Sequence, residues 1–263
     1  MQRIINRIGE FLASIGQALF FLGAVLGYLL RGKIRIAEVF KQIYEQGVQS
    51  IIIITLTSFS SGAVLALQGY VMLNRFGAKE YVAQLVALSL VREFSPVFSS
   101  FILSGKAGAR IAAELGTMNV NEQIVATRTM GVDPIEYLIV PRMLACFLTL
   151  PILIVISELV GIAGGYCIGV FDAGIPPSTY WNQTLKCINF VDFFSGFIKT
   201  LFFGLFIGWI CCYQGFYTKG GSLGVGRYTT NAVAYSYITI IVSNMFLTKL
   251  ILLKKYEKNI NCR

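Results

Sequence analysis

Two opposite charges stand side by side inside the apolar stretch LVALSLVREFS, residues 85–95. Arg92 and Glu93 are followed by Pro96, in a run that hydropathy alone would assign to a membrane. Neighbouring residues on a helix point about 100° apart, so these two charges cannot neutralise each other along one face. Each needs a partner of its own, because an unpaired charge inside a bilayer costs at least ~2.5 kcal/mol.

Two kinds of chemistry suit these charges. The planar guanidinium of Arg92 can bind two phosphate oxygens at once, which would make this segment the polar lining of a site for a phosphate-bearing group. Alternatively, Lys199 and Glu158 reach a similar depth in later apolar runs and could join Arg92 and Glu93 in a buried ion-pair network that fixes helix packing. Pro96 frees a backbone carbonyl, which is tolerated where a cavity or a neighbour satisfies it. Both interpretations remain open from the sequence.

Other chemistries have little support. The chain has no histidine, and none of its six cysteines forms a C-x-x-C pair, so we expect no metal or haem site. Gly105-Lys106 is followed by Ala107, and no G-x-x-x-x-G-K-[ST] motif occurs. We therefore expect no enzyme activity and no cofactor in this chain. Any ATP that drives it must be hydrolysed by another chain.

The composition is that of a polytopic membrane protein. Of 263 residues, 56% are hydrophobic and 13% charged, about half the ~25% charged residues of a soluble domain. Mean hydropathy is +0.69, and no cleavable signal pattern opens the chain. We assign the net charge of +9 to cytosolic loops facing anionic head groups. Nucleic-acid binding is not expected, because no compact basic patch with aromatic residues lies outside the apolar runs.

The apolar runs predict an all-α integral membrane protein with five transmembrane helices. A less apolar helix at 4–30 is expected to lie in the membrane interface, with a sixth span as the alternative. We divide the chain into an N-terminal helix and connector (1–47), a membrane-spanning domain (48–253) and a basic tail (254–263). The positive-inside rule places the N-terminus and the loops 105–134 and 219–231 in the cytosol. Five spans then place the C-terminus outside, but the basic charges of the tail argue against this orientation. The expected spans are 50–73, 81–103, 137–171, 190–217 and 232–253.

Glycines at four-residue spacing predict close helix packing. Gly161, Gly165 and Gly169 form such a run in the third span, and Gly204 and Gly208 repeat the spacing in the fourth. The segment 220–226, GGSLGVG, follows a span rather than a strand, so we expect a flexible loop there.

The loop between spans two and three should contain a short cytosolic helix. Asn119 followed by Glu122 is close to a capping box, and Gly131 followed by Asp133-Pro134 is a helix stop, which together predict a helix over about 120–130. A short helix is marginal in water without a docking surface. We interpret it as a docking helix for a cytosolic partner, with a simple connector as the alternative.

Five motifs together resemble the MlaE family, the permease subunits of ABC transporters that move phospholipid between membranes, which includes the permease of the plastid lipid importer. The resemblance covers about 42–247. It implies a homodimer with an interfacial N-terminal helix, ABC ATPases docked on the 119–131 helix, and a ring of MCE-domain proteins on the opposite face. It also implies a lipid in a cavity between the two subunits. The motifs are LALQGY (65–70), LVALSLVREFSPV (85–97), SGKAGARIAAELGTM (104–118), MGVDPIEYLIVPR (130–142) and LVGIAGG (159–165).

The resemblance also implies roles for individual residues. Acyl chains would contact Leu65, Leu67 and Tyr70, and Gln68 would border the cavity. The polar end of the lipid would face Arg92, Glu93 and Lys199. The ATPase would dock on Glu122, Arg128, Gly131 and Asp133. Glu158 departs from the family pattern, so its role is open.

The resulting hypothesis is the permease subunit of an ABC lipid transporter in a bacterial inner membrane or the plastid inner envelope. The alternatives are an ion-coupled secondary transporter, in which Glu93 or Glu158 titrates, and a non-transporting membrane scaffold.

Overall fold

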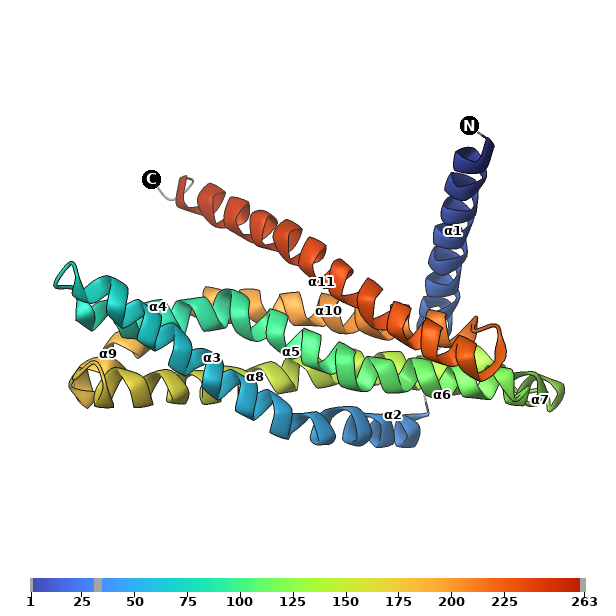
Figure 1. The fold of residues 1–263 in the computed structure, drawn as a ribbon, viewed down its shortest axis with the longest axis horizontal. Coiled ribbons are helices and arrows are strands. Elements are labelled where there is room, and N and C mark those ends of the chain that lie inside the picture. The colour runs from blue at the N-terminus through green and yellow to red at the C-terminus, as the bar shows by residue number, and fades with distance from the viewer. Residues whose placement is uncertain (1, 31–34, 261–263) are drawn as a thin grey trace.

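The computed structural model describes residues 2–30 and 35–260, and within them the chain is built from helices without strands (Figure 1). Five helical runs are long and apolar enough to cross a membrane, which makes the chain a multi-pass membrane protein. The runs are Ile36–Asn74, Lys79–Val120, Ile135–Phe171, Phe190–Phe216 and Gly221–Ile251.

Most spans consist of several consecutive helical elements. Span one comprises α2 (Ile36–Ile43), a π-turn (Tyr44–Val48) and α3 (Gln49–Asn74). Span two comprises a 3₁₀ turn (Lys79–Tyr81), α4 (Val82–Ser89), a π-turn (Leu90–Phe94), α5 (Ser95–Leu103), a π-turn (Ser104–Gly108) and α6 (Ala109–Val120). The remaining elements are α1 (Gln2–Leu30), α7 (Gln123–Thr129), a π-turn (Ile135–Ile139), α8 (Val140–Phe171), α9 (Pro177–Cys187), α10 (Phe190–Phe216) and α11 (Gly221–Ile260).

The five predicted spans are confirmed, but two predicted loops are wrong. The chain stays helical to Val120 instead of entering a loop at 105, because Gly108 and Gly116 let α6 pack closely on Cys211 and Thr218 of the α10 side. The expected flexible loop 220–226 is instead the start of α11. Gly220 and Gly221 have φ values of +92° and +67°, so the glycines reverse the chain and the helix then begins at once.

Two ends of the bundle can be distinguished in Figure 1. The start of α2, the short α7 and the turn between α10 and α11 lie at one end, and the α3–α4 turn, α9 and the C-terminal end of α11 lie at the other. This is the arrangement expected from five spans with the predicted cytosolic segments at one end. The predicted basic tail starts at 254, but α11 continues to Ile260, and only residues 261–263 of the tail lie outside the described residues.

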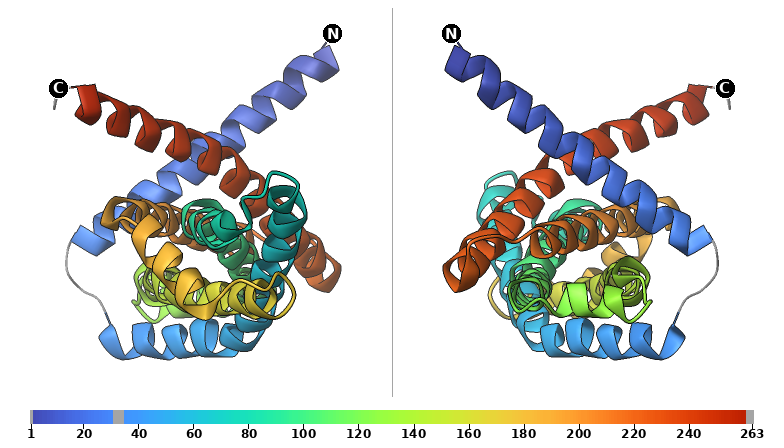
Figure 2. Two further views of the ribbon diagram at one scale, coloured as in Figure 1. Left: turned by 90° about the vertical axis from the view of Figure 1, so that its left-hand side faces the viewer. Right: turned by 90° about the vertical axis from the view of Figure 1, so that its right-hand side faces the viewer.

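Helix α1 lies across the bundle rather than along it (Figures 1 and 2). It is attached by Phe21, whose side chain is buried against the rings of Tyr213, Phe216 and Tyr217. The indole N–H of Trp209 donates to the carbonyl of Ala18 at 2.9 Å. The orientation is that expected of a helix in the membrane interface.

The closest backbone contact joins α3 to α8. A Cβ at Gly62 would overlap the carbonyl oxygen of Gly161, and a Cβ at Gly164 would overlap that of Phe59. Gly165 and Gly169 of the same helix face Tyr180: the Cβ position of Gly165 would lie 2.8 Å from its hydroxyl oxygen, and that of Gly169 2.8 Å from its ring. Such contacts are possible only where side chains are absent.

The fourth span meets the third in a similar way. A Cβ at Gly204 would lie 2.7 Å from the carbonyl oxygen of Cys146, and a Cβ at Gly208 would lie 3.0 Å from Cα of Met143. The glycine runs identified in the sequence therefore lie at the helix contacts of α8 and α10. Gly62, which contributes equally to the α3–α8 contact, stands outside any such run.

Candidate functional site

The Arg92–Glu93 pair lies on a π-turn, Leu90–Phe94, between α4 and α5. Such turns widen the helix by one residue and frequently occur at functional sites. Pro96 lacks an N–H, so it cannot donate the usual helical hydrogen bond to the carbonyl of Arg92 four residues earlier. Lys199 of α10 replaces that donor, because its Nζ lies 2.9 Å from the Arg92 carbonyl oxygen. The lysine thus repairs the break that the proline creates.

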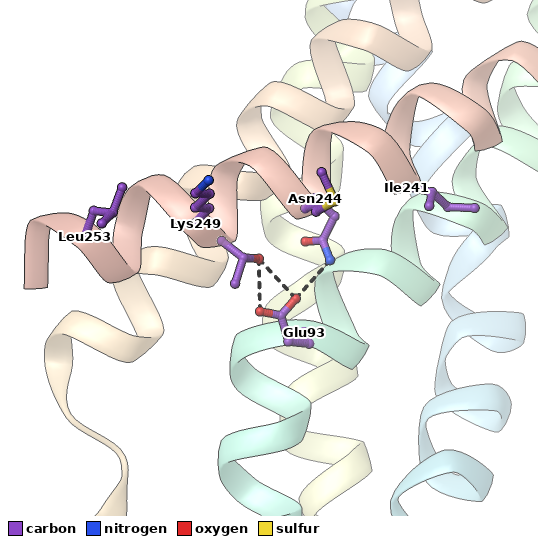
Figure 3. Close-up of a pocket in the computed structure, with 7 residues that line it drawn as sticks. Glu93, Ile241, Asn244, Lys249 and Leu253 are labelled. Atoms are coloured by element: carbon purple, nitrogen blue, oxygen red, sulfur yellow. Dashed lines mark hydrogen bonds between the residues drawn. The ribbon is translucent and has the colours of Figure 1, made fainter.

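Glu93 is the centre of a polar cluster that joins three helices. Its Oε1 accepts from Lys199 Nζ at 2.8 Å, and its Oε2 accepts from Asn244 Nδ2 at 2.9 Å. Thr248 accepts from Lys199 at 2.8 Å and donates to Glu93 at 3.1 Å. Asn244 and the two hydrogen bonds from Thr248 are drawn in Figure 3. Lys199 is 2% exposed, so its charge depends on these partners.

Arg92 points to a different partner, as helix geometry requires. Its Nη2 and Nε lie 2.9 Å and 3.1 Å from the same oxygen, Oδ1 of Asp192 at the start of α10. The Arg92 side chain is 38% exposed and that of Asp192 only 6%, so the aspartate is buried while the guanidinium remains accessible. The cluster therefore presents a cation at its edge.

Three members of this cluster were missed in the sequence: Asp192, Asn244 and Thr248. Asn244 and Thr248 stand four residues apart in an otherwise apolar run, and Asp192 stands seven residues before Lys199, so each shares a helix face with its neighbour. Polar residues at helical spacing inside a span were the available signal.

Glu158 does not belong to the cluster, so its proposed grouping with Arg92, Glu93 and Lys199 is wrong. Its side chain is buried, and its Oε1 has no hydrogen-bond partner among the described residues. That oxygen instead lies 3.7 Å from the Cβ position of Gly196, where α10 approaches the carbonyl of Val91 closely. The tight contact at Gly196 separates Glu158 from the ion pairs.

In the described part of the chain, two grooves and one small hollow border the π-turn. Arg92 lines the small hollow, about 40 Å³, together with Asp192 and Lys199. The larger of the two grooves, about 580 Å³, runs from Glu93 along α11 past Asn244 and Thr248 (Figure 3). Its other lining residues are Ile241, Met245, Lys249 and Leu253. It combines apolar walls with a polar centre.

The second groove, about 310 Å³, lies between α3 and α5 and contains Leu65, Gln68, Phe94 and Phe98. Of the residues expected to line a cavity on α3, the structure therefore brings together Leu65 and Gln68. Leu67 is exposed on another face of α3, and Tyr70 packs into the cluster of α3, α4 and α9 side chains. Neither of these two residues lines the grooves.

The short helix between spans two and three is present as α7 (Gln123–Thr129), but the predicted capping box is wrong. Asn119 still belongs to α6, and its amide donates to the carbonyl of Thr218 at 2.9 Å. Glu122 precedes α7 with φ of +59° and makes no capping bond. A left-handed residue here turns the chain sharply, which the sequence pattern did not reveal.

The four residues expected to form a docking surface divide into two groups. Glu122, Arg128 and Gly131 are exposed, and Met130 beside them is 79% exposed. Asp133 is turned inward: its Oδ1 accepts from the N–H of Ile135 at 2.9 Å, and its Oδ2 accepts from the hydroxyl of Tyr28. Asp133 thus ties α1 to the start of the third span.

An ion-pair network lies on the α6 side of the same end. Arg142 of α8 pairs with Glu114 of α6 at 3.3 Å, and Arg110 of α6 pairs with Glu114 at 3.5 Å and with Glu45 at 3.1 Å. The network joins spans one, two and three next to α7. Within the described residues, no group of three or more His, Cys, Asp or Glu side chains could hold a metal ion.

Comparison with known proteins decides the family. Residues 39–250 match the family model described as Permease MlaE. The chain belongs to the MlaE permease family. It is 35% identical over 249 residues to the intermembrane phospholipid transport system permease protein MlaE of Haemophilus influenzae, covering 92% of this chain and 94% of that one.

Two further relatives extend the comparison. A probable ABC transporter permease protein of Rickettsia typhi is 38% identical over 94% of this chain and 97% of its own length. The chloroplastic protein TRIGALACTOSYLDIACYLGLYCEROL 1 of Arabidopsis thaliana is 35% identical over 86% of this chain and 65% of its own. The MlaE-like region thus spans nearly all of this chain.

Proposed function

We propose that this MlaE permease is the membrane subunit of an ABC transporter that moves phospholipid or a related lipid between membranes. The name of the Haemophilus relative supports the substrate class, and those of the Rickettsia relatives support the transporter class. The chain has no nucleotide-binding motif, so separate ATPase subunits hydrolyse the ATP. The membrane is a bacterial inner membrane or a plastid inner envelope.

The observation that carries this proposal is the groove between the π-turn and α11. A phospholipid needs apolar walls for its acyl chains and a polar region for its head group. Ile241, Met245 and Leu253 supply the walls, and Glu93, Asn244 and Lys249 supply polar atoms in the same groove. Arg92 stands beside it with a partly exposed guanidinium suited to a phosphate.

The buried part of the cluster holds this arrangement in place. Lys199 neutralises Glu93 and fixes the Arg92 backbone, so the π-turn keeps its shape when a lipid enters. Asp192 orients the guanidinium of Arg92 without burying it. Both interpretations of the charges are thereby combined: the ion pairs secure the helices, and their exposed edge faces the lipid.

A second copy of the chain would complete the cavity. The outward face of α11 is apolar and exposed, and only 11% of its most apolar window is buried. The groove at Glu93 opens on the same helix. In a homodimer, pairing of these surfaces would enclose the two grooves in one cavity between the subunits.

The cytosolic and opposite ends would take different partners. The exposed surface of α7, with Val125, Arg128 and Met130, is the docking site for the ATPase. The contact of α7 with α6, and the ion pairs that Glu114 of α6 forms with Arg110 and with Arg142 of α8, would transmit ATPase movements to the spans. A ring of MCE-domain proteins would bind at the other end, where the cavity opens.

An affinity purification followed by mass spectrometry of proteins and lipids tests this function. The expected result is recovery of an ABC ATPase, an MCE-domain protein and phospholipid with the permease. Recovery of neither the ATPase nor phospholipid would contradict the proposal. Transport that persists without an ATPase and requires an ion gradient would instead favour a secondary transporter in which Glu93 or Glu158 titrates; Glu158 is buried, and its Oε1 has no hydrogen-bond partner in the described part of the chain.

A further inference from the structure

A second amphipathic groove lies at the end of the bundle near α7, away from the Glu93 groove. It lies between α1, α10 and α11, which contribute Ala18, Trp209 and Ile238 to its lining. Two adjoining cavities of about 570 Å³ and 600 Å³ make up the groove and share four lining residues. The shared residues are Gln214, Lys219, Tyr228 and Tyr235. The groove and the Glu93 groove have no lining residue in common.

The two cavities differ in chemistry. The one beside the α10–α11 turn contains Lys219 and Arg227 together with Asn231. The other, under α1, is lined by Trp209 and Tyr213 of α10 and by Tyr235 and Ile238 of α11. An occupant that spans both cavities must be polar at one end and apolar at the other.

The charge at the polar end is uncompensated. Lys219 and Arg227 are exposed, and neither forms an ion pair with a carboxylate of the described residues. None of the residues that line the two cavities is acidic. The polar end therefore selects an anionic group, and Arg and Lys at a membrane surface attract acidic lipid head groups.

The depth of the groove fits the boundary between head groups and acyl chains. Trp209 stands seven residues before the end of α10 at Phe216, which places it about 10 Å from that end at ~1.5 Å per residue. Trp and Tyr side chains concentrate at this level of a bilayer. The N–H of Trp209 is bonded to Ala18 of α1, so the helix that lies across the bundle forms one wall.

We infer that this groove is a binding site for an anionic phospholipid of the cytosol-facing leaflet, separate from the transported lipid. The head group lies at Lys219 and Arg227. The part of the acyl chains nearest the head group lies against Trp209, under α1. A bound lipid would join α1 to the α10–α11 turn. The inference goes beyond the proposed function and does not depend on transport.

Trp209 provides a direct probe, because the chain has two tryptophans and Trp181 lies on α9. In a Trp181→Phe background, Trp209 fluorescence is measured in nanodiscs of phosphatidylcholine that contain either brominated phosphatidylglycerol or brominated phosphatidylcholine at equal mole fraction. We expect the anionic quencher to be favoured by at least about fivefold in apparent occupancy. Equal quenching by the two lipids would overturn the inference.

Two variants with the same charge change identify the source of the selectivity. Lys219→Gln/Arg227→Gln removes the two groove cations and should abolish the preference. Lys41→Gln/Lys79→Gln removes two exposed cations outside the groove and should leave it unchanged. Equal loss in both variants would mean a general effect of protein charge and would contradict a specific site.

A final experiment distinguishes between a lipid and a soluble anion as the ligand of the groove. Millimolar inorganic phosphate is added, with sodium chloride of equal ionic strength as the control. Quenching by brominated phosphatidylglycerol should respond equally to the two salts. Selective relief by phosphate would show a site for a free anion and would overturn the assignment to a lipid.

Discussion

The α3–α8 contact and the attachment of α11 hold helices together by opposite means. Along α3 and α8, glycines bring the backbones into contact, and 56% of the most apolar window of the third span is buried. On α11, only 11% of the corresponding window is buried, and Glu93 binds the helix through Asn244 and Thr248. The first contact leaves no room for movement. The start of α11 is also packed, since Ala232 and Ile240 are buried, but its outer part beyond Ile240 is held beside the groove by a few polar bonds.

We infer from this difference that the helices have different roles: α3 and α8 form a rigid frame, and α11 forms a movable wall of the lipid cavity. Close-packed interiors respond to added volume because they have no space to relax. Polar bonds can exchange partners with a ligand that offers similar groups. Each of the following predictions tests one side of the comparison.

The largest effect is expected from Gly62→Ala. The new Cβ overlaps the carbonyl of Gly161, so α3 and α8 must separate, at a cost of about 3 kcal/mol. Thermal unfolding of the detergent-purified protein should occur at a clearly lower temperature than for the wild type. Gly23→Ala is the control, because nothing lies within 4 Å of its Cβ position. If both variants unfold alike, the frame is not close-packed.

A smaller loss of stability is expected from Lys199→Met. It leaves the Arg92 carbonyl without its donor and Glu93 without its cation, which should cost about 2 kcal/mol since Glu93 is partly exposed to solvent. Adding Glu93→Gln should recover part of that loss, because no unpaired carboxylate then remains. The same unfolding assay measures both. A double variant less stable than Lys199→Met would contradict the pairing.

Asn244→Leu should affect α11 alone. Removing the bond to Glu93 costs about 1.5 kcal/mol and should speed amide hydrogen exchange in residues 241–253 by about tenfold, with α3 and α8 unchanged. Thr239→Val is the control, because that hydroxyl donates only within its own helix, to Tyr235. Faster exchange in α8 as well would show that α11 belongs to the rigid frame.

The sequence was sufficient for the spans and for part of the site. Hydropathy located five membrane helices, and the separate directions of Arg92 and Glu93 followed from helix geometry alone. The sequence could not predict which residues of distant helices lie opposite one another. Asp192 and Asn244 reach the pair from helices 100 and 151 residues away, and Glu158 is diverted by the contact at Gly196.

The helix ends show the same limit. The charged segment 105–134 and the glycine-rich segment 220–226 were predicted to be loops. In the first, Gly108 and Gly116 are buried against neighbouring helices, and in the second, paired positive φ values start α11. Asn119 carried a capping signal but bonds instead to Thr218 across the bundle. Tertiary contacts overrode local preferences in each case.

The most direct test of the lipid site is phospholipid transfer by the reconstituted complex carrying Arg92→Ala, compared with Asp192→Asn. If the accessible guanidinium of Arg92 receives the head group, Arg92→Ala should lower transfer by about tenfold, as expected for one charge-assisted contact, while the amount of assembled complex stays near the wild-type level. Asp192→Asn keeps the guanidinium of Arg92 and should therefore lower phospholipid transfer less than Arg92→Ala does. Equal losses of transfer and assembly in Arg92→Ala would contradict the account, because Arg92 would then serve only to pack the helices.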